Sequence, residues 1–447
     1  MQISHTVPSW TIVLALAATP LLAQQATGAL PRTVQNIDTA QVAPAANASD
    51  VRAASTSMAA HHGAEPKTGR SAGLATVMAT STSNYVISTV AGSGTPGFGG
   101  DGGPAISAAL GAPLGVAVDS SGNLFIAEFE NERVRKVTPA GTISTVAGNG
   151  SFGFSGDGGP ATSAALFGPD GVAVDSAGNL FIADSANARI RKVTPAGMIS
   201  TVAGNGTLGF SGDGGPATSA ELSGPLGVAV DSAGNLFIAD GYTRVRKVTP
   251  AGTISTVAGN GIEGFSGDGG PATAAELYEG GVTVDSAGNL FIADTYNGRI
   301  RKVTPAGTIS TVAGSGTLGF SGDGGLATSA ELHWPQGVAV DGSGNLYIAD
   351  NADACIRKVA AAGTISTVAG NGIQGFSGDG GAATAAQLWS PTAVVVDGNG
   401  NVFIADEGNN RIRLLEPAGA GLTISAGGVV NAASYATGAV APGSSSP

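Results

Sequence analysis

The chain has 447 residues, a formal net charge of −12 at neutral pH and a single cysteine. Its acidic balance repels phosphate backbones and so disfavours nucleic acid as a partner. One cysteine excludes an internal disulfide, so packing must hold the fold together. A hydrophobic content of 42% excludes disorder along the whole chain.

The N-terminus predicts an export signal. Residues 10–23 form an apolar stretch, WTIVLALAATPLLA, that is too short to span a bilayer as a helix. It ends in small residues, as a signal peptide does before its cleavage site. We expect a signal peptide over residues 1–23, with an uncleaved membrane anchor as the alternative. Residues 24–84 are rich in Ala, Thr, Ser and Gln and predict a flexible linker.

Six copies of one sequence unit follow, in an array over residues 85–417. Most copies contain TVAGNG, GFSGDGG, GVAVD and NLFIAD segments or close variants of them. The aspartates that end the GVAVD segments are separated by 56, 56, 54, 56 and 56 residues. A fixed period of this length is typical of a repeat architecture. These aspartates are Asp119, Asp175, Asp231, Asp285, Asp341 and Asp397.

Each copy predicts four short strands, here called a, b, c and d, separated by Gly-, Asn- and Pro-rich turns. In the second copy we expect them at residues 171–175, 179–184, 189–194 and 198–203. Runs of about five residues rich in Val and Ile are typical of β-structure. Four strands in each of six copies predict an all-β fold, a six-bladed β-propeller of four-stranded blades.

The two ends of the array predict how the ring closes. Residues 85–91 resemble a strand d that has no a, b or c before it, whereas the last copy lacks a clear strand d. We expect the N-terminal strand to complete the last blade, which would remove a free sheet edge; residues 422–425 are the rival. The tail, residues 418–447, changes in composition and predicts the start of a truncated downstream module.

The segment GVAVDSAGNLFIADSANARIRKV resembles the NHL repeat. The long GFSGDGGPAT insert resembles the version found in secreted bacterial proteins and in the propeller of the teneurins. The resemblance covers all six copies. It implies a propeller that serves as an interaction platform, and it implies no reaction, because one fold hosts many functions.

Several repeated polar residues are expected to build the scaffold. In the DSAGN turns, Asp and Asn are expected to bond to their own hairpin backbone. Asp184 is expected to pair with Asn187 and Arg189 in the turn between strands b and c. The GDGG aspartates are expected to cap their own loops, although a ring of such acidic loops could also hold Ca²⁺. They are Asp101, Asp157, Asp213, Asp268, Asp323 and Asp379.

The copies differ most just before strand a and in the b–c turns, which a propeller places on the same face. Aromatic side chains at such positions can anchor a partner or stack on sugars; packing against neighbouring blades is the alternative. The candidate partner-binding residues are Phe129, Phe167, Asp170, Tyr242, Tyr278, Tyr296, His333, Trp334 and Trp389.

These observations favour an exported, monomeric and non-enzymatic platform that binds a protein or glycan through its top-face loops. The location would be secreted, periplasmic or on the cell surface, with no membrane span once the signal is cleaved. We assign no catalytic or metal-binding residue and no cofactor, with calcium left open. One alternative is a metal-dependent hydrolase or lyase that uses acidic channel residues. The other is a structural spacer in a larger surface protein. Weak candidates for the enzyme are Glu128, Asp170, Glu279 and His333.

Overall fold

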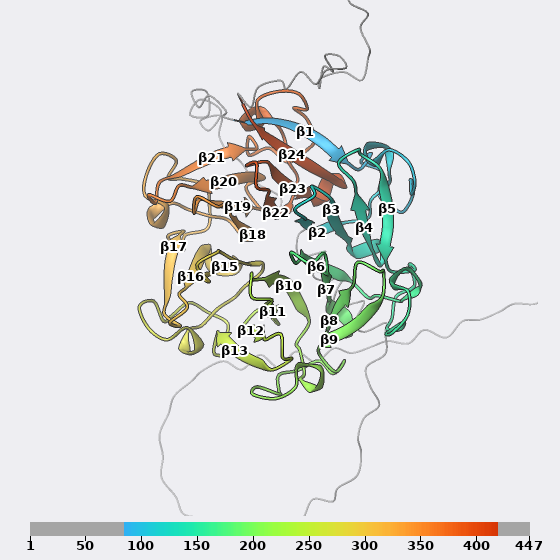
Figure 1. Ribbon diagram of the computed structural model, residues 1–447. Coiled ribbons are helices and arrows are strands. Elements are labelled where there is room, and N and C mark those ends of the chain that lie inside the picture. The colour runs from blue at the N-terminus through green and yellow to red at the C-terminus, as the bar shows by residue number, and fades with distance from the viewer. Residues whose placement is uncertain (1–84, 419–447) are drawn as a thin grey trace, which may run out of the picture. The chain divides into compact units, whose positions relative to one another are not determined.

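The computed structural model describes residues 85–418. The expected signal peptide, the linker and all but the first residue of the expected tail lie outside the described residues. Within them, 24 strands form six four-stranded antiparallel sheets arranged radially around a central axis (Figure 1). The predicted six-bladed propeller is confirmed.

Strands a to d follow one another in each of the first five blades, and the N-terminal strand joins the sixth. Blade 1 contains β2 (Pro113–Val118), β3 (Leu124–Glu128), β4 (Arg133–Val137) and β5 (Ile143–Ala147). Blade 2 contains β6 (Pro169–Val174), β7 (Leu180–Asp184), β8 (Arg189–Val193) and β9 (Ile199–Ala203). Blade 3 contains β10 (Pro225–Val230), β11 (Leu236–Asp240), β12 (Arg244–Val248) and β13 (Ile254–Ala258). Blade 4 contains β14 (Val282–Val284), β15 (Leu290–Asp294), β16 (Arg299–Val303) and β17 (Ile309–Ala313). Blade 5 contains β18 (Pro335–Val340), β19 (Leu346–Asp350), β20 (Cys355–Val359) and β21 (Ile365–Ala369). Blade 6 contains β22 (Pro391–Val396), β23 (Val402–Asp406), β24 (Arg411–Pro417) and β1 (Tyr85–Ala91).

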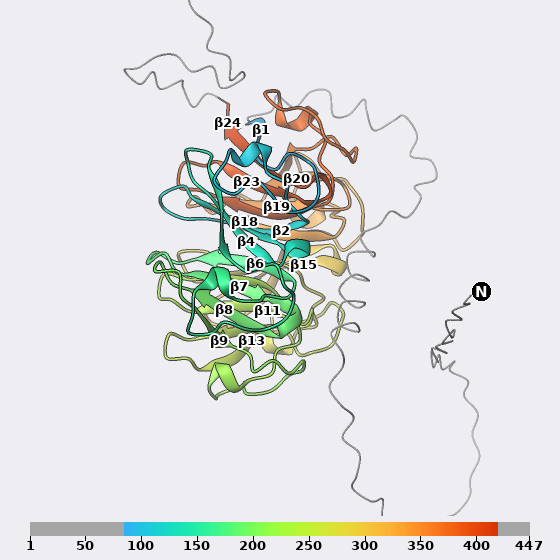
Figure 2. The same cartoon turned by 90° about the vertical axis from the view of Figure 1, so that its right-hand side faces the viewer.

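The hydrophobic core lies between neighbouring blades. Strand b is buried along its whole length in every blade. Between blades 1 and 2, Phe125 and Ala127 pack with Val172 and Ile182. Burying one such large side chain contributes roughly 1.5–3 kcal/mol. This packing repeats around the ring, which is seen from the side in Figure 2.

The N-terminal strand closes the ring as predicted. β1 pairs antiparallel with β24, with Tyr85 opposite Pro417 and Ile87 opposite Leu415. The Tyr85 hydroxyl also lies 2.9 Å from the hydroxyl of Tyr347 in blade 5. Blade 6 therefore has four strands although the last sequence copy supplies only three of them.

The long inserts that join strand d to the next strand a cover the outer edges of the blades. The insert before blade 2 pairs with β9: Gly158 N donates to Ile199 O at 2.8 Å and Ile199 N donates to Gly159 O at 3.0 Å. The insert before blade 6 pairs with β1 in the same way: Ile87 N donates to Gly381 O at 3.1 Å. Each outer strand thus has a partner on both sides, which protects it from pairing with another chain.

Short 3₁₀ helices complete the connections. Those in the inserts are η2 (Ala105–Ser107), η4 (Ala161–Ser163), η6 (Ala217–Ser219), η7 (Ala272–Ala274), η9 (Ala327–Ser329) and η10 (Ala383–Ala385). Those in the b–c turns are η3 (Phe129–Asn131), η5 (Ser185–Asn187), η8 (Thr295–Asn297) and η11 (Glu407–Asn409).

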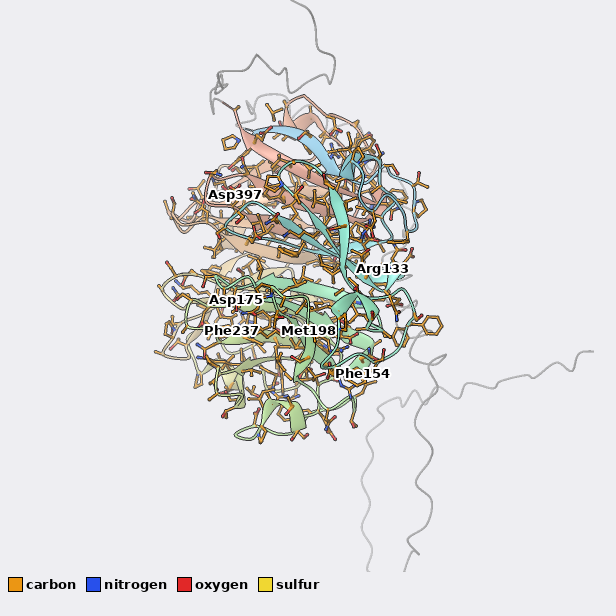
Figure 3. The ribbon with its side chains drawn as sticks, turned by 45° about the vertical axis from the view of Figure 1, so that its right-hand side comes forward. Arg133, Phe154, Asp175, Met198, Phe237 and Asp397 are labelled. Carbon is orange, nitrogen blue, oxygen red and sulfur yellow. The ribbon has the colours of Figure 1, made fainter. Side chains whose placement is uncertain are left out.

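The DSAGN hairpins between strands a and b bond as expected. Asp175 Oδ1 accepts from the backbone of Ala177 at 3.0 Å and of Asn179 at 2.8 Å, and its Oδ2 accepts from the Asn179 amide at 2.7 Å. Asp397, labelled with Asp175 in Figure 3, makes the same contacts in blade 6. The prediction that these residues fix their own hairpins is confirmed.

Candidate binding site at the channel mouth

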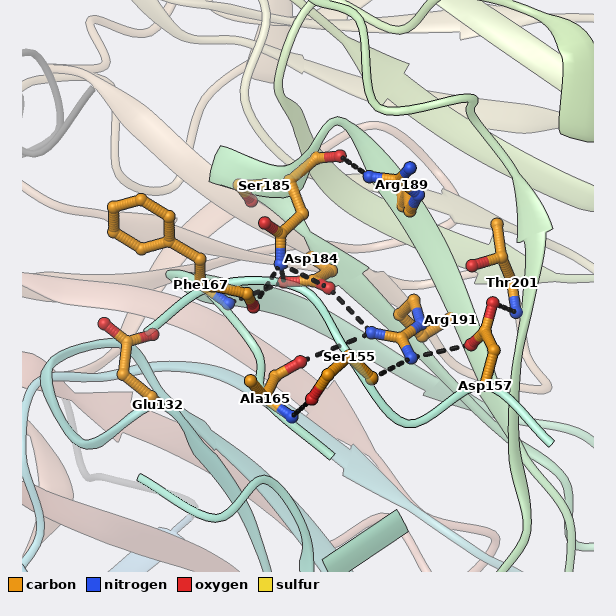
Figure 4. Close-up of polar contacts among 12 residues, drawn as sticks. Glu132, Ser155, Asp157, Ala165, Phe167, Asp184, Ser185, Arg189, Arg191 and Thr201 are labelled. Carbon is orange, nitrogen blue, oxygen red and sulfur yellow. Dashed lines mark hydrogen bonds and ion pairs between the residues drawn. The ribbon is translucent and has the colours of Figure 1, made fainter. Parts of the chain in front are cut away.

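A buried arginine in strand c ties each blade to its insert. Arg191 donates from Nη1 to Asp184 Oδ2 at 3.1 Å and from Nη2 to Asp157 Oδ1 at 2.7 Å (Figure 4). Asp184 also accepts from the backbone N of Phe167 at 2.7 Å. Burial raises the pKa of Asp184 to about 6, opposed by these hydrogen bonds and by the Arg191 charge. The equivalent arginines, all fully buried, are Arg135, Arg246, Arg301, Arg357 and Arg413.

The predicted pairing of Asp184 with Arg189 was wrong. Arg189 donates instead to the backbone oxygens of Asn187 at 3.0 Å and Asn205 at 2.7 Å, and its guanidinium carbon lies 3.7 Å from the ring centre of Phe154. Arg191 pairs with the Asp184 carboxylate because both side chains are fully buried, whereas Arg189 is half-buried. The pairing of Asp184 with Asn187 is confirmed, at 2.9 Å.

The GDGG aspartates hold the inserts against the blades rather than capping their own loops. Asp157 accepts from Arg191 and, through Oδ2, from the backbone N of Thr201 in β9 at 3.1 Å. Partial burial raises its pKa, but the hydrogen bonds from Thr201 and Arg191 together outweigh this and keep that pKa below the ordinary carboxyl range. An arginine lies within 2.8 Å of the equivalent carboxylate in every blade. Calcium binding at these loops stays an alternative that no contact described above tests.

The b–c turns and the residues before strand a share one face, here called the top face. Ala186 N, in a b–c turn, donates to Phe167 O at 3.1 Å. In blade 4 Tyr296 N likewise donates to Tyr278 O at 3.3 Å. The variable positions before strand a and those in the b–c turns therefore lie side by side on this face.

Five rings form a continuous arc across blades 3, 4 and 5 on the top face. Ring centres are 5.9 Å apart for Tyr242 and Tyr278, and 4.1 Å apart for Tyr278 and Tyr296. Tyr296 is 6.2 Å from Trp334, which is 5.2 Å from His333. Tyr296 is 37% exposed, so the arc presents an aromatic surface to solvent. We call these five residues the aromatic arc.

A cavity of about 740 Å³ opens beside the arc along the axis of the ring. Its wall contains strand-a residues of all six blades together with b–c turns. Four carboxylic acids contribute to this wall, and no Lys, Arg or His does. The four are Glu130, Asp170, Glu279 and Glu407.

Two one-residue deletions break the symmetry of the ring at this cavity. The b–c turn of blade 3, from Asp240 to Arg244, is one residue shorter than in the other blades. Blade 4 has Tyr278 alone where the others have two residues before strand a, and Glu279 stands where the others have proline. These two deletions account for the spacing of 54 instead of 56 residues.

Glu279 links the two shortened segments. Its backbone N donates to Tyr242 O at 2.7 Å, and its Oε1 accepts from Asp240 N at 3.2 Å. Glu279 is fully buried, and its Oε2 has no hydrogen-bond partner among residues 85–418. Burial, reinforced by the nearby Asp240 and Asp294 charges, raises the pKa of Glu279 well above the ordinary range.

Two further wall acids, Asp170 and Glu407, also have raised pKa values. Burial raises the pKa of Asp170 to about 7. Burial, followed by repulsion from Glu130 and Asp406, raises the pKa of Glu407 to about 7. Burial and then the charge of Asp170 raise the pKa of Tyr242. Both side chains line the cavity. The wall thus carries carboxyl groups with no basic side chain beside them.

The structure brings five of the nine predicted residues together at the cavity and places the other four outside its wall. Five line the cavity: Phe129, Asp170, Tyr242, Tyr278 and Tyr296. His333 and Trp334 lie outside the cavity wall, at the end of the arc. Phe167 is buried against Phe152, and Trp389 is 45% exposed over Gly408 in blade 6.

Sequence reasoning did not select Glu130, Glu279 or Glu407 as binding residues. The spacing of 54 residues was the available signal for Glu279, because it marks the one place where the repeat is irregular. Among the weak enzyme candidates, Glu128 pairs with Arg135 at 3.1 Å and so serves the scaffold. Within residues 85–418 no three His, Cys, Asp or Glu side chains gather as metal ligands do.

Comparison with known proteins identifies the class. A family model described as the teneurin NHL domain matches residues 152–211, 208–266 and 319–374, and one described as the NHL repeat matches residues 388–413. With the six four-stranded blades, these matches show that the array is an NHL-repeat propeller.

Curated relatives include several teneurins. Mouse teneurin-4 is 28% identical over 349 residues, which cover 68% of this chain and 12% of that protein. Mouse teneurin-1 is 32% identical over 230 residues, covering 46% of this chain and 8% of that protein. The chain thus spans only a small part of the length of these relatives.

Solved structures share the fold. A Bacteroides thetaiotaomicron protein of unknown function has a TM-score of 0.57 at 21% identity, over 74% of this chain and 75% of that one. An auxiliary nutrient binding protein from Bacteroides ovatus has a TM-score of 0.55 at 17% identity, over 75% and 77%. In the described part of this chain, no helix has the length and hydrophobicity needed to cross a membrane.

Proposed function

We propose that this protein is an exported, non-enzymatic platform that binds a protein partner through the aromatic arc on its top face. The arc is the observation that carries the proposal. It joins residues of three blades at positions where the six copies differ, while the scaffold residues of those copies are nearly the same. Clustered Tyr and Trp side chains are the commonest strong contributors to protein interfaces.

The repeat itself supplies matched variants for a test. Trp334 has a positive φ of 55°, and Ala112 occupies the equivalent position in blade 1 with a φ of 44°. Tyr296 in blade 4 corresponds to Ala186 in blade 2. Trp334→Ala and Tyr296→Ala therefore introduce residues that this fold already accepts at those places. Leu326→Ala, at an insert position where blade 6 has Ala382, removes a 65% exposed apolar side chain away from the arc and is the control.

The experiment captures secreted and surface proteins of the source organism on the purified chain. We expect the two arc variants to lose the captured partner and Leu326→Ala to retain it. A partner held equally well by all three variants would contradict the role of the arc. A glycan array run in parallel distinguishes the alternative, a glycan ligand, because stacking on sugars would use the same rings. N-terminal sequencing of the mature protein tests export, with Gln24 expected as the first residue.

A further inference from the structure

Two acids of the channel wall, Asp170 and Glu279, stand at positions where no other blade has an acid. The acids that build the blades have partners within the scaffold: Asp184 pairs with Arg191, and Asp175 accepts hydrogen bonds from its own hairpin. Asp170 stands where blades 1 and 3 have leucine, namely Leu114 and Leu226, so the fold itself does not require a carboxylate there. Glu279 likewise replaces a proline found in the five other blades.

Glu279 is the most informative of these acids, because one of its carboxyl oxygens has no hydrogen-bond partner among residues 85–418. A buried carboxyl oxygen without a hydrogen-bond partner costs free energy, and such groups usually have a partner in the functional state. Oε2 of Glu279 is fully buried and unpartnered among residues 85–418, and the residue lies in the cavity wall. A ligand in the cavity can supply the partner once the side chains that cover Glu279 move aside.

The chemistry of the wall specifies the charge of that ligand. Four carboxylic acids line the cavity without a basic side chain among its wall residues, so an anion would be repelled. Tyr242, Tyr278 and Tyr296 line the same cavity. The faces of tyrosine rings attract ammonium and guanidinium groups. Carboxylates beside aromatic faces are thus suited to an organic cation.

We propose that this cavity binds an organic cation, an alkylammonium or guanidinium group, between Asp170, Glu279 and the tyrosines of the aromatic arc. This inference deepens the proposed function and rests on it where the cation belongs to a protein partner. The same chemistry is offered by a small free amine and by a Lys or Arg side chain of a partner. The raised pKa values of Asp170 and Glu279 fit such a site, because a bound cation would return these groups to their charged form.

The direct test is calorimetric titration of the full chain with putrescine and with methylguanidinium, using 1,4-butanediol as the uncharged match to putrescine. We expect both cations to bind and the diol not to bind. At neutral pH, binding should release protons, which titrations in two buffers of different ionisation enthalpy measure. Absence of cation binding, or equal binding of the diol, would overturn the proposal.

Variants locate the site. Asp170→Leu introduces the residue of blades 1 and 3, and Glu279→Gln keeps an acceptor for the Asp240 N–H. Each is expected to weaken cation binding by about tenfold or more, because it removes one charged partner from a desolvated site. Glu331→Gln is the control: it also removes one negative charge, outside the cavity wall, where blade 6 carries Gln387. Cation binding unchanged in Asp170→Leu, with melting curves showing a folded protein, would refute the site.

The source of the cation is decided by a second titration, with blocked tripeptides containing a central Lys or Arg. Tighter binding of a peptide than of the free cation points to a partner's side chain, and the reverse points to a small amine; both outcomes support the cavity. The two proposals fail separately. If Trp334→Ala loses the captured partner and the wild-type chain binds no cation, the proposed binding platform is supported and only the cation site is refuted.

Discussion

At the scale of single residues, the most demanding feature is the buried guanidinium. Arg191 and Asp184 are both fully buried, and a charge left alone there would be strongly unfavourable. Because Arg189 and Arg191 lie two residues apart on one strand, they share a face, and the sequence alone could not tell which of them reaches Asp184. The choice between the two arginines depends on how Asp184 is buried beside Phe167, whose backbone N donates to it. That contact joins segments distant in sequence.

Replacing the buried arginine should therefore destabilise the protein. Arg191→Met is expected to cost about 3–5 kcal/mol, since it leaves Asp184 as a buried unpaired charge. Arg189→Cys, which copies Cys355 of blade 5, should cost much less because Arg189 is half-buried. Urea denaturation measures both, and equal losses would show that the buried pair has no special role.

The pH dependence of stability should carry the signature of Asp170. Its pKa is raised to about 7 in the folded protein from an ordinary value of 3.8, so the folded state holds the proton more tightly. Stability from this group is present below pH 4 and is lost as the pH rises towards 7. No basic side chain lines the cavity to oppose this rise of the Asp170 pKa; Tyr242 lines the same cavity.

Asp170→Leu should remove that loss. We expect the variant to melt higher than the wild type at pH 8, by more than any difference seen at pH 4. The measurement is a set of thermal melts between pH 4 and 8. Glu407, with a pKa raised in the same direction, remains in both proteins and cancels in the comparison. Parallel pH curves for the two proteins would contradict the assignment.

At the scale of elements, the inserts determine how neighbouring blades depend on one another. Each insert leaves one blade, covers the outer strand of the next and is fixed there by its GDGG aspartate. The sequence predicted the strands and the closing role of residues 85–91, since both follow from local patterns. The path of the insert could not be predicted in this way, because the pairing of Gly158 with Ile199 joins segments that are distant in sequence.

Removing β1 should expose the edge of β24. A chain starting at residue 92 lacks the strand that pairs with β24 and receives the last insert. We expect it to aggregate or to melt well below a chain starting at residue 80, which retains β1. Light scattering coupled to gel filtration compares them; two equally stable monomers would show that the closure contributes little.

At the scale of the whole molecule, the ring has near-sixfold symmetry with one irregular sector. The two deletions meet between blades 3 and 4, where Glu279 contacts Asp240 and Tyr242. The sequence revealed the missing residues through the spacing of 54. It could not reveal that they face each other across one blade boundary, because that depends on the curvature of the closed ring. The aromatic positions were predictable as variable rim residues, whereas the acidic wall was not.

Restoring the regular repeat should separate stability from binding. The variant would gain one residue after Tyr242 and one after Tyr278, together with Glu279→Pro, as in the other blades. We expect β14 to lengthen, the melting temperature to stay level or rise, and affinity for methylguanidinium to fall. Melting and calorimetry on the same sample provide the measurement. Undiminished affinity in a folded variant would show that the irregular sector is not the binding site.

The closure of the ring also fixes how the molecule would respond to mechanical force. Tyr85, the first residue of β1, lies opposite Pro417, the last residue of β24. A pull on the chain before one and after the other would load this end of the pair first, so the backbone hydrogen bonds would break one after another instead of sharing the load. Single-molecule stretching should record a weak first opening of blade 6, whereas a pull between residues inside two different blades should meet greater resistance. The same strand pair that seals the ring against other chains is thus the place where tension opens it.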